Sequence, residues 1–187
     1  MPLPPPSSER QLLHTRNVVC EGFERPDGLF EIDGWITDVR SYAMRNHDRG
    51  QIPAGEPLHG MGLRLTITRR YEITDAVAVT DFAPMSICPN VTPNFKRLIG
   101  LKMTDGFTKA VHRVLGGVDG CTHLVDILRP MAVVAFQTIV GKDLASETKP
   151  APGTEDAKRR EGFINSCHGW RDDGPMVQRN FPDRFTG

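Results

Sequence analysis

The order of two hydrophobic periodicities limits what this chain can fold into more than any other feature of its sequence. Residues 17–82 contain stretches in which apolar and polar residues alternate, as in strands, whereas helical spacing begins only after residue 92. Strands followed by helices, without β-α-β alternation, are typical of helices packed on one face of an antiparallel sheet. The sequence therefore predicts an α+β fold whose sheet is made of N-terminal hairpins.

Two hairpins account for the predicted sheet. The first joins "NVVCEGF" to "LFEIDGWITDV" through the turn "PDG", and the second is "GLRLTITRRYEITDAVAVTDF", which bends near "TRRYE". In the second hairpin Leu63, Leu65 and Ile67 share one face, and Tyr71 fits the partner strand. Residues 41–60 between the hairpins show no periodicity, so we expect a long irregular loop there.

Three helices are predicted in the second half of the chain. "TPNFKRLIG" has Pro93 in its first turn, and "TDGFTKAVHRVLGG" ends at two glycines. The longest helix, "CTHLVDILRPMAVVAFQTIVG", carries an apolar stripe, and we expect Pro130 to kink it. These helices supply the layer that covers the sheet.

The composition fits one globular domain, and we expect it in the cytoplasm because the sequence shows neither a secretory signal nor a membrane span. Of the 187 residues, 39% are apolar and 25% are charged, which suffices for a single core. We expect a proline-rich arm over residues 1–13 and one domain over residues 14–187, with a mobile polar segment at 142–161. The start of the chain lacks the order of a secretory signal, and no apolar run approaches the roughly 20 residues of a membrane span.

Charge and motifs argue against several kinds of partner. Lys plus Arg and Asp plus Glu number 23 each, so no overall field attracts the chain to nucleic acid or to an anionic membrane. The sequence contains no Walker loop and no G-x-G-x-x-G, G-x-S-x-G or H-E-x-x-H motif, which disfavours nucleotide cofactors. The proline-rich arm favours a homodimer, because it can reach a neighbouring subunit.

The stretch "GGVDGCTHLVDIL", residues 116–128, contains the first candidate site. Cys121 falls in the opening turn of the longest predicted helix, where unpaired amides and the helix dipole stabilise a thiolate. His123 lies off the apolar stripe, which favours a functional role for it. In the structural alternative, Cys121 is a small buried apolar residue and His123 pairs with Asp126.

The second candidate is "GEPLHG", in which Glu56 and His59 lie three residues apart between glycines. A histidine moves protons readily near neutral pH, and a neighbouring carboxylate can orient it. In the structural alternative His59 is a surface residue at the start of a hairpin, and His47 in "NHDRG" fits a solvated loop. Further candidates for lining a pocket are Trp35, Tyr42, Tyr71, Asp81 and Gln137.

Scattered cysteines and histidines also permit a metal site. Cys88, Cys121, His123 and Cys167, the last next to His168, would suffice to bind zinc or iron. Their spacing matches neither a zinc finger nor a zinc ribbon. We therefore expect no metal, and a Cys/His metal-binding or scaffold protein is the alternative.

Several blocks of the sequence carry a family resemblance: "RNVVCEGFERPDGLFEIDGWITD", "AGEPLHGMGLRLTI", "ICP" with "RLIGL", and "LGGVDGCTHLVDIL" with "AFQT". Together they resemble the bacterial family known as domain of unknown function 2889, from about His14 to Val140, with a fainter match at "SCHGW". The family typically has an aspartate after the middle histidine, where this chain has Gly60. A His–Asp pair is therefore not expected at that point.

The resemblance implies a companion of aromatic and acyl-chain catabolism, which favours a small enzyme. We expect a cofactor-independent lyase or hydro-lyase that uses histidine acid–base chemistry, for example to release formaldehyde from a lignin-derived aromatic. His59 or His123 would be the base, and Tyr42 or Arg64 would stabilise oxyanion charge. A non-catalytic module that binds a small ligand is the further alternative.

Overall fold

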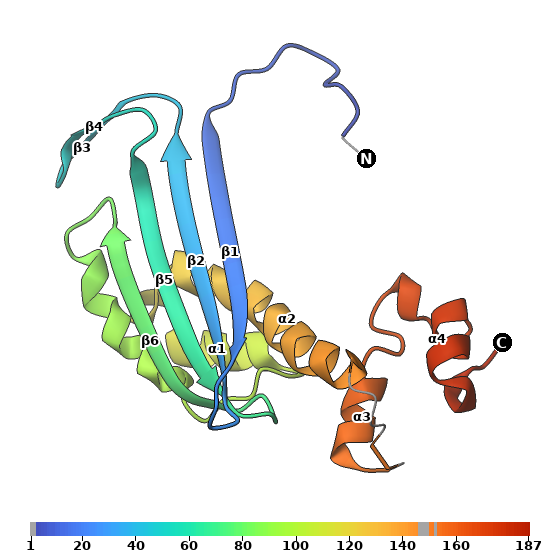
Figure 1. Cartoon of the computed structure of the whole chain (residues 1–187). Coiled ribbons are helices and arrows are strands. Elements are labelled where there is room, and N and C mark those ends of the chain that lie inside the picture. The colour runs from blue at the N-terminus through green and yellow to red at the C-terminus, as the bar shows by residue number, and fades with distance from the viewer. Residues whose placement is uncertain (1–2, 146–149, 152) are drawn as a thin grey trace. The chain divides into compact units, whose positions relative to one another are not determined.

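The computed structural model contains an antiparallel sheet of four strands, β1 (His14–Glu24), β2 (Phe30–Arg40), β5 (Pro57–Ile67) and β6 (Ile73–Phe82). They lie side by side in the order β1-β2-β5-β6 (Figure 1). Between β2 and β5 the chain forms a separate two-stranded hairpin of β3 (Met44–Asn46) and β4 (Gly50–Ile52).

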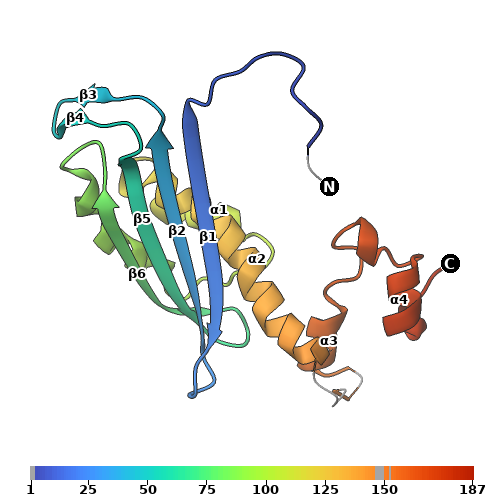
Figure 2. The same ribbon diagram turned by 45° about the horizontal axis from the view of Figure 1, so that its top comes forward.

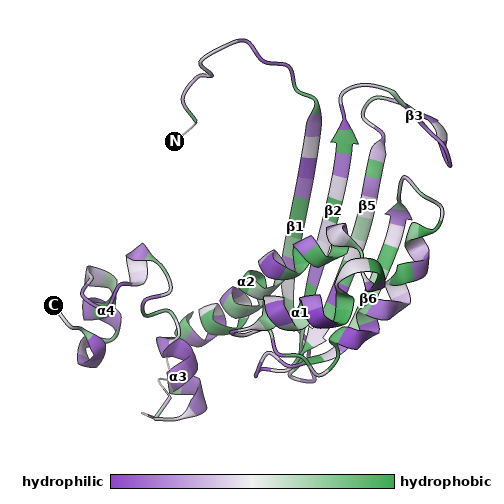
Figure 3. Cartoon of the chain, turned by 180° about the vertical axis from the view of Figure 1, so that it is seen from behind, coloured by the Kyte–Doolittle hydropathy of each residue, from purple (hydrophilic) through white to green (hydrophobic). Residues whose placement is uncertain are grey.

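The helices follow the strands in the chain. They are α1 (Phe107–Leu115), α2 (Thr122–Ala145), α3 (Glu155–Glu161) and α4 (Pro175–Asn180), with 3₁₀ segments at Cys88–Leu98 (η1), Gly117–Asp119, His168–Trp170 and Pro182–Arg184. Seen from the front and from behind, α1 and the first turns of α2 lie against one face of the sheet (Figures 2 and 3). The predicted α+β fold, with helices of the C-terminal half on an N-terminal antiparallel sheet, is confirmed.

The structure describes residues 3–145, 150–151 and 153–187, and the chain divides into two units, Met1–Ala135 and Phe136–Gly187. One domain over residues 14–187 stays a prediction; α2 begins in the first unit and ends in the second. The described part of the predicted arm, residues 3–13, is exposed and has neither helix nor strand. Within the segment predicted to be mobile, residues 146–149 and 152 lie outside the described residues, and residues 155–161 form α3.

Apolar side chains of the sheet and the helices share the core of the first unit. Every second residue of β2 faces the helices, and Gly34 in the middle of that row has no side chain. A Cβ atom at Gly34 would lie 2.6 Å from Sδ of Met131 on α2, so the glycine lets the helix approach the sheet closely. The core includes Phe30, Ile32, Ile36, Leu63, Leu65, Ile67, Phe95, Leu98, Phe107, Val111, Leu115, Leu124, Ile127 and Leu128.

The expectation of an irregular loop over residues 41–60 is wrong in two respects. The segment contains the β3–β4 hairpin, and β5 begins within it at Pro57. The hairpin forms because Asn46 Oδ1 accepts hydrogen bonds from the backbone amides of Asp48 and Arg49, at 3.1 and 2.9 Å, which closes a tight turn. His59 therefore stands on a strand and not on a loop.

The second hairpin and the first helix also differ from their predicted forms. Tyr71 lies in the turn between β5 and β6, at a φ of 63°, because the Thr68 hydroxyl accepts hydrogen bonds from the amides of Arg70 and Glu72 and closes that turn. The helix expected from Pro93 is the 3₁₀ segment η1, which already begins at Cys88. The predicted α1 and α2 are present, although α2 continues to Ala145.

Aromatic rings hold the second unit together. The ring of Phe163 lies 4.9 Å from that of Phe136 and 5.0 Å from that of Trp170, which in turn lies 6.2 Å from the ring of Phe181. These contacts agree with the expectation of an ordered C-terminal segment with aromatic residues. α3 is hydrophilic along its length (Figure 3).

Among the described residues, α2 is long and apolar enough to cross a membrane by length and composition alone. The core helix of a soluble protein passes the same test. In the first unit, Leu124, Ile127 and Met131 of α2 are fully buried.

Gly120, which precedes α2, should be intolerant of a side chain. A Cβ atom there would lie 2.0 Å from the carbonyl oxygen of Leu115, so Gly120→Ala must displace the backbone at the start of α2. We expect a loss of about 1–3 kcal/mol in the free energy of unfolding, measured by urea denaturation. Gly141→Ala is the matched control, since a Cβ atom inside α2 at that position meets nothing within 4 Å; it should stabilise by up to about 1 kcal/mol. Equal stability of the two variants would contradict the packing described at Gly120.

Candidate functional site

One level of the sheet carries a row of polar side chains on its helix-covered face. Asp38 of β2 pairs in register with Arg16 of β1 on one side and with His59 of β5 on the other. Because Gly34 and Ile36 occupy the preceding positions of this face, Asp38 continues the core row of β2, and its side chain is only 1% exposed. The register of β2 against β5 shifts directly after this pair, at a bulge between Asp38 and Val39.

Asp38 is the centre of a hydrogen-bond network. Arg16 binds both carboxylate oxygens, with Nε 2.8 Å from Oδ1 and Nη2 2.9 Å from Oδ2. His14, half exposed on β1, has its Nε2 3.2 Å from Oδ1, and His59 has its Nδ1 3.0 Å from Oδ2. The buried carboxylate is thus surrounded by one guanidinium and two imidazoles from neighbouring strands.

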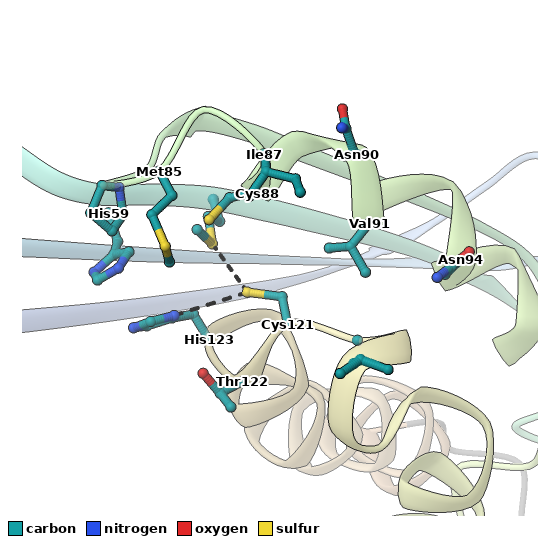
Figure 4. A pocket seen from close by; sticks show the side chains of 14 residues that line it. His59, Met85, Ile87, Cys88, Asn90, Val91, Asn94, Cys121, Thr122 and His123 are labelled. Carbon is teal, nitrogen blue, oxygen red and sulfur yellow. Dashed lines mark hydrogen bonds between the residues drawn. The ribbon is translucent and has the colours of Figure 1, made fainter. Parts of the chain in front are cut away.

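The start of α2 brings a third imidazole to the same carboxylate. His123 Nε2 lies 3.7 Å from Asp38 Oδ2, and the rings of His123 and His59 are 3.7 Å apart between centroids and tilted by 31°. Cys121 Sγ lies 3.9 Å from Nδ1 of His123 and 3.7 Å from Sδ of Met61 (Figure 4). The two histidines singled out in the sequence therefore lie together although 64 positions separate them.

These imidazoles line a cavity of about 620 Å³ between the start of β5, the segment after β6 and the start of α2 (Figure 4). Apolar side chains cover most of its wall, and none of the described residues that line it is an Asp, Glu, Lys or Arg. Its polar groups are His59, His123, the thiols of Cys88 and Cys121, and the side chains of Asn90, Asn94 and Thr122. The site is therefore an apolar cavity with two imidazoles at one end.

Burial, charges and hydrogen bonds at the site change the pKa values of Asp38, His59 and His123. Burial acts to raise the pKa of Asp38, but the hydrogen bonds and charge of Arg16, together with His59 and His14, outweigh it and bring that pKa to about 2. Burial is the main cause that lowers the pKa of His59, and the charge of His123 lowers it further. Burial is also the main cause that lowers the pKa of His123, and the charge of Arg16 adds to it. At neutral pH the site therefore holds an ionised carboxylate and neutral cavity imidazoles.

Several residues expected at the site have other partners. Glu56 forms an ion pair with Arg49, and Tyr42 accepts a hydrogen bond from Arg40. The structure places neither Glu56 nor Tyr42 in the wall of the cavity.

Other expected residues lie on other surfaces. Arg64 binds Asp33 on the sheet face opposite Asp38, and on that face Trp35 packs over Gly62. Asp81 is exposed on β6, and Gln137 and Cys167 belong to the second unit.

The metal ligands considered from the sequence are only partly brought together. Cys88, Cys121 and His123 all line the cavity. In the part of the chain that the structure describes, however, the ligand atoms that converge within 4.8 Å are those of Asp38, His59 and His123.

Asp38, Arg16 and His14 are absent from the residues singled out in the sequence. A signal for Asp38 was available, since it continues the alternation of Phe30, Ile32 and Ile36 and is therefore a charged residue on a predicted core face. Arg16 and His14 carry no such signal, because their importance depends on the register of β1 against β2.

The carboxylate network predicts a specific acid sensitivity. The pKa of Asp38 is lower in the folded chain than in the unfolded chain, so its contribution to stability is complete above about pH 4 and is lost as the pH falls towards 2. Between these limits the free energy of unfolding should drop by on the order of 2 kcal/mol more in the natural chain than in Asp38→Asn. Urea unfolding at stepped pH, with a chelator present, measures this. A natural slope in Asp38→Asn would refute the prediction.

Comparison with known proteins gives one match. No curated protein and no solved structure matches the chain. Residues 14–137 match the family described as protein of unknown function (DUF2889), and this range contains every residue of the carboxylate network and of the cavity wall. The chain belongs to the DUF2889 family.

Proposed function

We propose that this chain is a small enzyme of aromatic-compound catabolism, a lyase or hydro-lyase that works by histidine acid–base chemistry. The observation that carries the proposal is the imidazole of His59, which is fixed by Asp38 through one nitrogen and lies at the wall of an apolar cavity. The same proposal places the enzyme in the cytoplasm as a homodimer, and both statements are predictions from the sequence.

The hydrogen bond to Asp38 prepares His59 to act as a base. An ionised carboxylate only accepts hydrogen bonds, so Nδ1 of His59 carries the proton and Nε2 keeps its lone pair. When Nε2 takes a proton, the resulting imidazolium lies against the negative charge of Asp38, which stabilises it. Arg16 keeps the carboxylate ionised and in place.

A formaldehyde-releasing reaction needs only this chemistry. The base removes the hydroxyl proton of a hydroxymethyl group, the oxygen forms the C=O bond of formaldehyde, and the electron pair of the broken C–C bond goes to the aromatic fragment. Return of the proton from the imidazolium to that carbon completes the reaction, with no oxidant or reductant. In this proposal His123, whose ring lies beside that of His59, donates a hydrogen bond to the developing charge.

The cavity wall fits an aromatic substrate better than a charged one. Met61, Met85, Ile87, Val91 and Val118 supply apolar surface, and methionine contacts aromatic rings favourably. A carboxylate or phosphate on the substrate would find no Lys or Arg among the described residues of the wall. The volume of the cavity is within the usual range for small-molecule sites.

Removing either cavity imidazole should abolish most of the activity. His59→Ala and His123→Ala are each expected to lower turnover by about 10²–10⁴-fold in protein that circular dichroism shows to be folded. The assay is formaldehyde release from a panel of hydroxymethyl-bearing aromatics. His112→Ala, an exposed histidine of α1, is the matched control and should keep full activity.

Two results would overturn the proposal. If both cavity variants turn over substrate at the natural rate, the imidazoles are not catalytic. If aromatics bind with a dissociation constant that depends on His59, but no product forms from any of them, the chain is a binding module.

A further inference from the structure

We propose that Asp38, His59 and His123 form a binding site for a divalent transition metal of the zinc and ferrous iron class. This ligand set differs from the cysteine-based set considered from the sequence. A metal bound there would displace the proton that Nδ1 of His59 carries in the lyase proposal, so the two proposals concern different forms of the site. Metal uptake can be measured without any substrate.

The spacing of the three ligand atoms matches a metal site. With bonds of about 2.1 Å and angles between octahedral and tetrahedral values, neighbouring ligand atoms lie roughly 3.0–3.4 Å apart. Asp38 Oδ2 lies 3.0 Å from His59 Nδ1 and 3.7 Å from His123 Nε2, and one ligand atom from each of the three residues lies within 4.8 Å of the other two. A cation can bind all three residues once their side chains move to draw these ligand atoms together.

The donor types also fit this class of metal. Two imidazoles and one carboxylate on one side of an ion are typical of non-haem iron sites and of catalytic zinc sites, in which the remaining positions stay open. His59 and His123 both line the cavity, so the open positions would face it. Calcium and magnesium prefer oxygen ligands and are poor candidates.

Groups around the three ligands already hold them in position. Arg16 and His14 fix the carboxylate of Asp38 from the side of β1, and Cys121 lies next to the second ring nitrogen of His123. Such outer partners orient ligands in known metal sites.

Titration of chelator-treated protein with Co²⁺ tests the site, because visible d–d absorption reports nitrogen and oxygen ligation. We expect one Co²⁺ per chain, displaced by Zn²⁺. His59→Ala and His123→Ala should each weaken binding about 100-fold or more, since even outer partners of metal ligands cost 10–100-fold. Asp38→Asn should weaken Co²⁺ binding to the same extent, provided that circular dichroism shows the variant to be folded. If Asp38→Asn does not fold, the two histidine variants alone test the site.

Matched variants separate this site from the alternatives. His112→Ala, Cys88→Ser and Cys167→Ser should bind Co²⁺ as the natural chain does. Absence of stoichiometric uptake, or uptake that survives both His59→Ala and His123→Ala, overturns the inference, as does loss of binding in the cysteine variants alone. Turnover measured in chelator-treated protein tests the lyase proposal separately, so either proposal can fail without the other.

Discussion

The buried carboxylate of Asp38 is the constraint on which the rest of the site depends. A charge that is only 1% exposed is unfavourable unless other groups compensate it, and here Arg16 supplies both the opposite charge and two hydrogen bonds. That compensation requires β1 to pair with β2 in the observed register, because a slip by one residue would turn Arg16 to the other face. His59 of β5 and His123 of α2 surround the same carboxylate from the other side. The network therefore couples the assembly of the sheet to the position of the helix.

The sequence predicts most of the fold because its periodicities are local. The alternation in β2 and β5 and the helical spacing of α1 and α2 are visible within each segment. The β3–β4 hairpin is not visible in this way, since its turn is closed by the side chain of Asn46. The same is true of the turn at Thr68, which removes Tyr71 from its expected strand.

The candidate site was predictable only in part. His59 and His123 stand out in the sequence because each lies in a glycine-rich stretch, and the structure brings them into one cavity. The partner of His59 could not be found by looking along the chain: Glu56, three residues away, turns to Arg49, and the carboxylate that binds His59 comes from 21 residues upstream. The aspartate that the family resemblance leads us to expect after His59 is absent, because Gly60 stands there, yet His59 pairs with Asp38 across the sheet. Register between strands, and not nearness in sequence, determines this pairing.

The bulge beside Asp38 has a consequence for how such a chain can vary. The positions of Asp38 and His59 are determined by the regular ladder that runs from Phe30 and Ile67 up to their pair, while the irregularity lies on the far side, towards residues 41–56. Insertions or deletions in that connection would be absorbed beyond the bulge. The connection over residues 41–56 can thus change length and sequence without disturbing the charged cluster around Asp38.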